Sequence, residues 1–294
     1  MGNGRAGAAA AMVVLILSGV LGCGPATTAG SGGSPSDEAG AVLHDGTATE
    51  EQRRAVEAYW AGGAMAEVAR GDASEDLVQP AWTGGGSIAR TVGRLYASSG
   101  VDGRSGACTA TLVGVRTVVT AAHCVSTSVE GASARAAAWD RNLLFVPGYQ
   151  GGAGPHGGFT VRRVRMAEDW GTDGRHVAML EMNPGADGRN ASDVVGAAQP
   201  ISFAAEPGGS AHFFGYPYTD RVLHCSGAAA LVAGRTLVRV PCPMGVGSSG
   251  GPYLSGDPAE GSVIAVNVSG DGGASYGTAL GAFAQGLYRQ SEHG

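Results

Sequence analysis

The amino-acid sequence predicts an all-β protein built as a sandwich or as barrels. Beyond residue 83, many short runs with strand propensity follow one another, turns rich in Gly, Asn, Asp and Pro separate them, and helical periodicity is almost absent. The 52 glycines show no Gly-X-Y period and are interleaved with apolar runs, which is typical of a loop-rich β protein and not of collagen or a linker.

Composition excludes several other classes. Of the 294 residues, 44% are hydrophobic and 15% charged, which excludes a highly charged disordered chain and a membrane protein with several spans. The 19 basic and 25 acidic side chains give a net charge of −6, and the arginines are scattered along the chain. Because no basic stripe is present, we do not expect nucleic acid as a partner.

The N-terminus looks like a bacterial lipoprotein signal peptide. An uncharged, largely apolar stretch follows Arg5 and ends in Val20-Leu21-Gly22-Cys23. It is shorter than the roughly 20 residues of a membrane span, and the small Gly22 suits a peptidase that cleaves ahead of a cysteine to be lipidated. We therefore expect a signal peptide over residues 1–22 and a lipidated tether over 23–48. Ordinary secretion, with Cys23 incidental, is the alternative.

A helical segment is expected before the strands. The stretch from Thr49 to Ala69 has a Thr cap, early Glu residues and apolar positions at helical spacing, while Gly62-Gly63 weakens it in the middle. We expect a short helical prosegment or linker over residues 49–82, and the sequence leaves open whether residues 41–80 inhibit the rest of the chain. Strands are then expected over residues 91–96, 108–113, 117–120, 143–146, 159–164, 177–180, 211–214, 229–232, 236–240 and 263–268.

Four of the five cysteines belong to the strand-rich region. Export places them in an oxidising compartment, where pairing Cys108 with Cys124 and Cys225 with Cys242 closes two short loops. This is one of three possible pairings. A zinc site made of His212, His224, Cys225 and Cys242 is a competing idea, although its spacing fits no common zinc motif.

Two motifs carry the chemistry and point to a family. Thr120-Ala121-Ala122-His123-Cys124 follows an apolar strand, and Gly247-Ser248-Ser249-Gly250-Gly251-Pro252 lies far downstream. Both motifs resemble those of the trypsin-like (chymotrypsin-fold) serine peptidases, and the resemblance covers about residues 83–290. The resemblance implies two packed six-stranded antiparallel β-barrels, over about 83–185 and 200–288, with the active site between them.

A narrower likeness links the chain to actinobacterial secreted peptidases related to glutamyl endopeptidases. It is carried by Ala58-Tyr59-Trp60 in the expected prosegment, by the stretch from Trp82 to Gly93, and by the placement of Cys225 and Cys242.

The resemblance gives each motif residue a role. Ser249 is implied as the nucleophile and His123 as its base, because a free hydroxyl is a weak nucleophile and imidazole titrates near neutral pH. The N–H groups of Gly247 and Ser249 are implied as the oxyanion hole. The family commonly has a disulfide where Cys108 and Cys124 stand, which pins the strand end that carries the base.

The third catalytic position departs from the family pattern. An Asp is expected immediately before a stretch of the form Val/Ile-Ala-x-Leu, and here His176 precedes Val177-Ala178-Met179-Leu180. A neutral imidazole can accept the Nδ1–H of His123 but supplies no negative charge. Because a protonated His176 could no longer accept this hydrogen bond, we expect activity to require neutral to alkaline pH. Asp173 is a candidate substitute, and Asp169 a weaker one.

Two further positions bear on activation and specificity. Ser248 stands where the animal digestive members have an Asp that receives a newly cut N-terminus, so that activation switch is not expected. The strand over residues 263–269 is implied to line the primary specificity pocket, with substrate contacts from Asn267, Val268 and Ser269. Asn267 falls where glutamate-specific relatives place a His, and the alternative is a strand-end residue with local hydrogen bonds.

The sequence thus predicts an exported serine endopeptidase that acts on protein or peptide substrates through an acyl-enzyme on Ser249. It is expected to be a monomer without cofactor or metal, held on the outer face of a bacterial cell membrane by a lipid on Cys23, or secreted. The competing hypothesis is a catalytically impaired homologue that acts as a cell-surface binding protein because His176 replaces the Asp.

Overall fold

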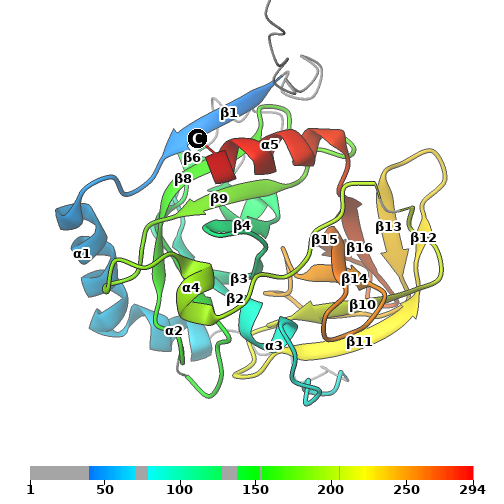
Figure 1. The fold of residues 1–294 in the computed structure, drawn as a ribbon, viewed down its shortest axis with the longest axis horizontal. Coiled ribbons are helices and arrows are strands. Elements are labelled where there is room, and N and C mark those ends of the chain that lie inside the picture. The colour runs from blue at the N-terminus through cyan, green and yellow to red at the C-terminus, as the bar shows by residue number, and fades with distance from the viewer. Residues whose placement is uncertain (1–39, 71–78, 128–137, 153, 205, 294) are drawn as a thin grey trace, which may run out of the picture. The chain divides into compact units, whose positions relative to one another are not determined.

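The computed structural model describes residues 40–70, 79–127, 138–152, 154–204 and 206–293, all within the unit Ser34–Gly294. These residues form two barrel-like antiparallel sheets with few helices (Figure 1). The expected all-β fold with two packed barrels is therefore confirmed. The expected signal peptide, Cys23 and most of the expected tether lie outside the described residues.

Barrel one is a closed sheet. It contains β2 (Val92–Ser98), β3 (Ser105–Leu112), β4 (Thr117–Thr120), β7 (Arg141–Pro147), β8 (Phe159–Ala167) and β9 (Ala178–Met182). The order β8-β7-β2-β3-β4-β9 closes because β8 also pairs with β9. A separate two-stranded sheet of β5 (Ser126–Thr127) and β6 (Ala138–Trp139) follows the segment that carries His123.

Barrel two is nearly closed, with the order β11-β10-β14-β15-β16-β13-β12. Its strands are β10 (Ser210–Gly215), β11 (Leu223–Ala228), β12 (Ala230–Leu231), β13 (Leu237–Val240), β14 (Pro252–Ser255), β15 (Ser262–Gly270) and β16 (Ser275–Ala279). The turn that contains Ser249 leads directly into β14, so barrel two positions the expected nucleophile.

Each barrel has its own apolar core, and a third core joins them. Leu95, Phe145 and Leu180 lie inside barrel one, and Phe213 and Tyr253 lie inside barrel two. The joining core contains buried side chains from both barrels, among them Val92, Val119, Phe214 and Val266. Because burial of apolar surface is the dominant favourable contribution to folding, this shared core holds the two barrels together. It thereby fixes the position of His123 on barrel one relative to Ser249 on barrel two.

The segment before the barrels is folded onto barrel one. Part of the range expected as tether forms β1 (Ala41–Asp45), which pairs with β8. The expected helix is present as α1 (Glu50–Tyr59), with a capping box between Thr49 and Gln52. It is interrupted at the glycine pair, where η2 (Trp60–Ala64), a π-helical turn containing Gly63 at φ 107°, precedes α2 (Met65–Arg70).

Trp60 anchors this segment. Its side chain is 3% exposed, contacts Tyr96 of β2, and donates from Nε1 to the carbonyl oxygen of Asn142 at 2.6 Å. These contacts make the N-terminal segment a packed part of the fold. Truncating a buried Trp typically costs about 3–5 kcal/mol of stability, so we expect Trp60 to contribute strongly to this packing.

Three further helices complete the described chain: α3 (Ile88–Thr91), α4 (Ala191–Val195) and α5 (Ala282–His293). The C-terminal α5 follows barrel two but packs on β9 and β4 of barrel one (Figure 1). Its Glu292 accepts hydrogen bonds from the Val115 N–H at 3.0 Å and from the Thr117 hydroxyl. Within the described residues, no helix is long and apolar enough to cross a membrane.

Candidate active site

His123 lies on a short helical turn held by a disulfide. After β4, the chain forms η3 (Ala122–Cys124), a single 3₁₀ turn. Cys124 is bonded to Cys108 on the neighbouring β3, and Cys225 is bonded to Cys242. These are the two pairings expected from the sequence. The first disulfide ties the turn carrying His123 to barrel one.

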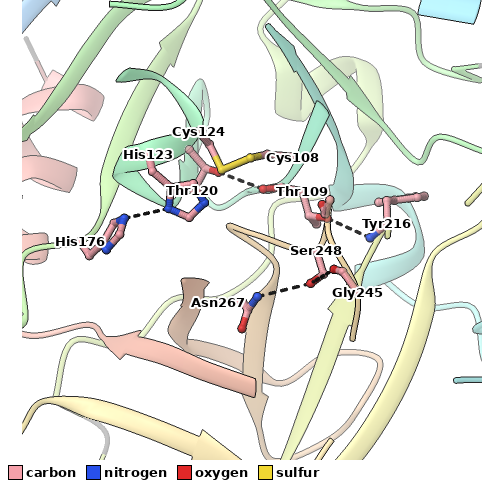
Figure 2. Close-up of a disulfide and its surroundings, with 11 residues drawn as sticks. Cys108, Thr109, Thr120, His123, Cys124, His176, Tyr216, Gly245, Ser248 and Asn267 are labelled. Carbon is pink, nitrogen blue, oxygen red and sulfur yellow. Dashed lines mark hydrogen bonds between the residues drawn. A yellow bond between two sulfur atoms is a disulfide. The ribbon is translucent and has the colours of Figure 1, made fainter. Parts of the chain in front are cut away.

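His176 faces His123 directly (Figure 2). The Nδ1 atom of His123 and the Nε2 atom of His176 are 2.8 Å apart. In the tautomer in which His123 donates from Nδ1, its Nε2 is left free to act as a base. The ring of Trp170 packs against His176 at 4.6 Å between ring centroids. The structure thus places an imidazole and an indole where a carboxylate is expected in the family.

Burial keeps both imidazoles neutral. It lowers the pKa of His123 to about 4. It also lowers the pKa of His176, to about 3, with a smaller contribution from the charge that His123 carries when protonated. Desolvation disfavours the cationic form of each ring, and neither ring has a carboxylate partner in the described part of the chain. The pair therefore begins the reaction uncharged near neutral pH.

Asp173 and Asp169, the two candidate substitutes for the third catalytic residue, bond to partners other than His123. The carboxylate of Asp173 accepts a hydrogen bond from the Thr236 N–H at 2.7 Å and lies 3.4 Å from Arg235 Nε, so it is held by barrel two. Asp169 forms an ion pair with Arg175 at 3.1 Å. Both candidate substitutes therefore bond other groups, and the side chain that meets Nδ1 of His123 is His176.

The turn carrying Ser249 contains two glycines in the left-handed backbone region. Gly247 has φ +96° and Gly250 has φ +78°, a conformation that favours glycine. A Cβ atom at Gly250 would overlap Thr120 Oγ1 and the carbonyl oxygen of Thr109. Within the described residues, the N–H groups of Gly247 and Ser249, expected from the sequence as the oxyanion hole, have no hydrogen-bond acceptor.

Asn267 supports this turn from β15. Asn267 is 3% exposed, and its main-chain carbonyl oxygen accepts from the Gly250 N–H at 2.7 Å. Its side-chain amide lies 3.4 Å from Ser248 Oγ (Figure 2). Tyr253 Oη is 3.0 Å from the same amide. These contacts match the alternative in which Asn267 makes local hydrogen bonds. Val268 and Ser269 lie beyond Val266, where the pairing of β14 with β15 ends.

His123, Gly247 and Ser249 open onto one cavity of about 380 Å³. Its other walls come mainly from barrel one and include Leu95, Ala97, Cys108, Asp140 and Tyr218. No described residue before Leu95 lines it, so the N-terminal segment over residues 41–70 leaves this cavity open.

A metal site is not supported by the cysteines. Ligand atoms of Cys108, His123 and Cys124 lie within 4.8 Å of one another, but both sulfurs are joined in a disulfide. The zinc idea fails for the same reason, because Cys225 and Cys242 bond each other. The remaining two members form a pair, with His212 Nδ1 and His224 Nε2 at 3.1 Å.

Sequence reasoning missed two residues of the site, Thr109 and Trp170. Thr109 is buried beside Cys108 and bonds to the Ser249 turn, whereas the ring of Trp170 packs at a tilt against His176. Their positions next to a site cysteine and just before His176 were the available signals, but neither residue type is diagnostic of catalysis.

Comparisons with known proteins point to trypsin-like serine proteases. The Trypsin family model matches residues 84–227. No curated protein matches the sequence. Among solved structures, the thermostable serine protease AL20 from an extremophilic microorganism is 25% identical with a TM-score of 0.63, covering 70% of this chain and 98% of that one.

Two further solved structures are similar. Protease Anisep from Arthrobacter nicotinovorans is 29% identical with a TM-score of 0.62, covering 71% of this chain and 99% of its own. A Glu endopeptidase in complex with MPD is 16% identical with a TM-score of 0.59, covering 75% and 99% respectively, and this likeness concerns the fold alone.

Proposed function

We propose that this chain, which has the trypsin-like chymotrypsin fold and resembles bacterial serine proteases, is an exported serine endopeptidase. The observation that carries this proposal is that His123, Gly247 and Ser249 line one cavity, while the N–H groups of Gly247 and Ser249 have no acceptor among the described residues. Nucleophile, base and oxyanion donors are the three groups that acyl transfer needs.

The reaction begins with Ser249. As Oγ bonds to the carbonyl carbon of the substrate, its proton passes to Nε2 of His123, and the carbonyl oxygen becomes an oxyanion facing the Gly247 and Ser249 N–H groups. When the C–N bond breaks, His123 returns that proton to the leaving amine. Water then attacks the acyl-enzyme, with His123 again as base, and the acid product leaves.

In this scheme, His176 is a positioning residue. Its Nε2 atom accepts the Nδ1–H of His123 at 2.8 Å and so fixes the tautomer and the orientation of the base. Trp170 restrains the His176 ring in turn. Val268 and Ser269, at the free end of the β14–β15 pairing, are the backbone groups proposed to align the substrate.

A second candidate function is supported by one observation. No carboxylate contacts either imidazole among the described residues, and burial lowers the pKa of His123 to about 4, which makes it a weak base. A catalytically impaired homologue that binds proteins at the cell surface would show the same geometry. The two functions differ in whether Ser249 is activated.

Covalent labelling distinguishes them. An organophosphonate should modify the full-length chain on Ser249, and Ser249→Ala and His123→Ala should each abolish the labelling. Ser226, an exposed serine on β11, supplies the matched control, because Ser226→Ala should be labelled like the wild type. Labelling that is no faster in the wild type than in Ser249→Ala would contradict the peptidase and favour the binding protein.

A further inference from the structure

The turn that carries the oxyanion donors is held without a charged group. Ser248 is 1% exposed, and its hydroxyl donates to the carbonyl oxygen of Gly245 at 2.7 Å. No ion pair reaches Gly245–Gly251 in the described part of the chain. Since Gly247 and Gly250 have wide backbone freedom, some other contact must hold the turn in the shape that exposes the two N–H groups.

Thr109 of β3 supplies that contact, and all of its polar groups are used; Figure 2 shows its bonds to Thr120 and Tyr216. It is fully buried. Its N–H donates to the carbonyl oxygen of Ser249 at 2.8 Å, and its hydroxyl donates to the carbonyl oxygen of Gly247 at 2.9 Å. The same hydroxyl accepts from the Tyr216 N–H at 2.9 Å, and the Thr109 carbonyl oxygen accepts from Thr120 Oγ1 at 2.9 Å.

The Tyr216 segment is itself fixed to barrel one. Tyr216 donates its phenolic hydrogen to the carbonyl oxygen of Tyr149 at 2.9 Å, and Arg94 donates to the carbonyl oxygen of Thr219 at 2.6 Å. Gly247 packs closely on this segment, because a Cβ atom there would lie 2.7 Å from the Tyr216 carbonyl oxygen. The Thr109 hydroxyl therefore joins the oxyanion turn to a rigid neighbour.

Resting on the proposed function, we propose that the Thr109 hydroxyl is the positioning group that keeps the oxyanion hole formed. Only a group that donates and accepts at once can bond both the Gly247 carbonyl oxygen and the Tyr216 N–H, and a hydroxyl does this. The hole is then ready in the full-length chain, without a charged partner at residue 248.

Loss of this hydroxyl has a specific consequence. It leaves a buried carbonyl oxygen and a buried N–H unpaired, which is costly, and the glycine-rich turn relieves the cost by rotating its peptides. Rotation moves the Gly247 N–H away from the developing oxyanion. Stabilisation of the transition state falls, whereas ground-state substrate binding along β15 is little changed.

The test uses Thr109→Val, which keeps the side-chain shape and removes the hydroxyl, Thr109→Ser, which keeps the hydroxyl, and Thr111→Val as control. Thr111 is also fully buried on β3, two residues along and on the same face, but its hydroxyl has no partner among the described residues. Each full-length variant is assayed for kcat and KM on a peptide ester, organophosphonate labelling rate, pH profile and thermal midpoint.

We expect Thr109→Val to lower kcat and the labelling rate about 10- to 100-fold, with KM changed by less than about 3-fold and an unshifted pH profile. Thr109→Ser should restore most of the rate, and Thr111→Val should match the wild type. A Thr109→Val protein that melts earlier but keeps wild-type kcat and labelling would overturn this inference alone. A wild-type chain that is not labelled would overturn the proposed function, and this inference with it.

Discussion

At the scale of single residues, the pairing of two neutral imidazoles decides how the site works. His176 can orient His123, but it cannot offset the positive charge that His123 acquires when it takes the Ser249 proton. Burial strengthens this limitation, because it lowers the pKa values of His123 and His176 to about 4 and about 3. The pair is therefore well oriented and weakly basic.

These pKa values change the pH dependence expected from the sequence. An ordinary imidazole at position 176 would become a cation below about pH 6.5, which suggested activity only in neutral and alkaline conditions. With both pKa values lowered, the rings stay neutral as the pH falls through 6 and 5. The acid limit of activity in the wild type is thus expected near pH 4 to 5.

His176→Asp should raise kcat and move the acid limit of activity to higher pH. A carboxylate beside His123 stabilises its imidazolium, which lowers the barrier and raises the pKa of His123. In the general triad template, replacing the acid with a neutral amide lowers turnover by about 10⁴, partly through a wrong tautomer, so we expect a gain of about 10- to 1000-fold. The measurement is a pH profile of kcat/KM for both proteins.

Asp173→Ala serves as the control for this prediction, since Asp173 bonds Thr236 and not His123. It should leave the profile unchanged. If His176→Asp left both rate and profile as they were while Asp173→Ala abolished activity, Asp173 would be the third member and His176 a bystander.

At the scale of elements, β3 organises the site. It carries Cys108, which fixes the turn of His123, and Thr109, which contacts the turn of Ser249. One strand thus connects the base, which lies on barrel one, with the nucleophile, which lies on barrel two. Because Cys108 and Thr109 are neighbours on β3, this strand brings the two distant motifs close together.

The two disulfides permit a matched comparison at this scale. Their sequence separations are 16 and 17 residues, so removing either should cost a similar amount of stability, about 3 kcal/mol. Only Cys108–Cys124 holds η3. We expect the Cys108→Ala/Cys124→Ala pair to lower kcat well beyond the Cys225→Ala/Cys242→Ala pair, as measured by denaturant unfolding and kinetics below the unfolding transition. Equal kinetic losses would show that the first disulfide has no special part in placing His123.

At the scale of the whole molecule, membrane attachment remains a prediction from Val20-Leu21-Gly22-Cys23. The described residues contain no helix able to cross a membrane. Cys23→Ala should release the protein from the membrane fraction or block its processing, because several acyl chains, at about 0.8 kcal/mol per buried CH₂, supply the anchoring. Fractionation and the mass of the N-terminal peptide are the measurements. Wild-type protein that is freely soluble and carries no lipid on Cys23 would contradict the prediction.

The sequence by itself determined the fold class and the two motif residues, His123 and Ser249. Alternation and turn residues depend on local order, so most strands of both barrels could be predicted. Strand β11 was missed because Leu223–Ala228 contains no β-branched residue, β14 because Pro252 opens it and β16 because Gly277 interrupts it. Helix α5 was missed because Gly286 weakens its helical pattern.

Only the tertiary structure decided what surrounds the motifs. Whether His176 or Asp173 meets His123 depends on how the turn before β9 closes, because two residues only three positions apart are not distinguished by sequence spacing. The role of Thr109 is likewise invisible in the sequence, since its partners Gly247 and Tyr216 lie more than 100 residues away along the chain. Local sequence patterns specify single strands and helices, whereas hydrogen bonds between distant segments form only where the two barrels share one core.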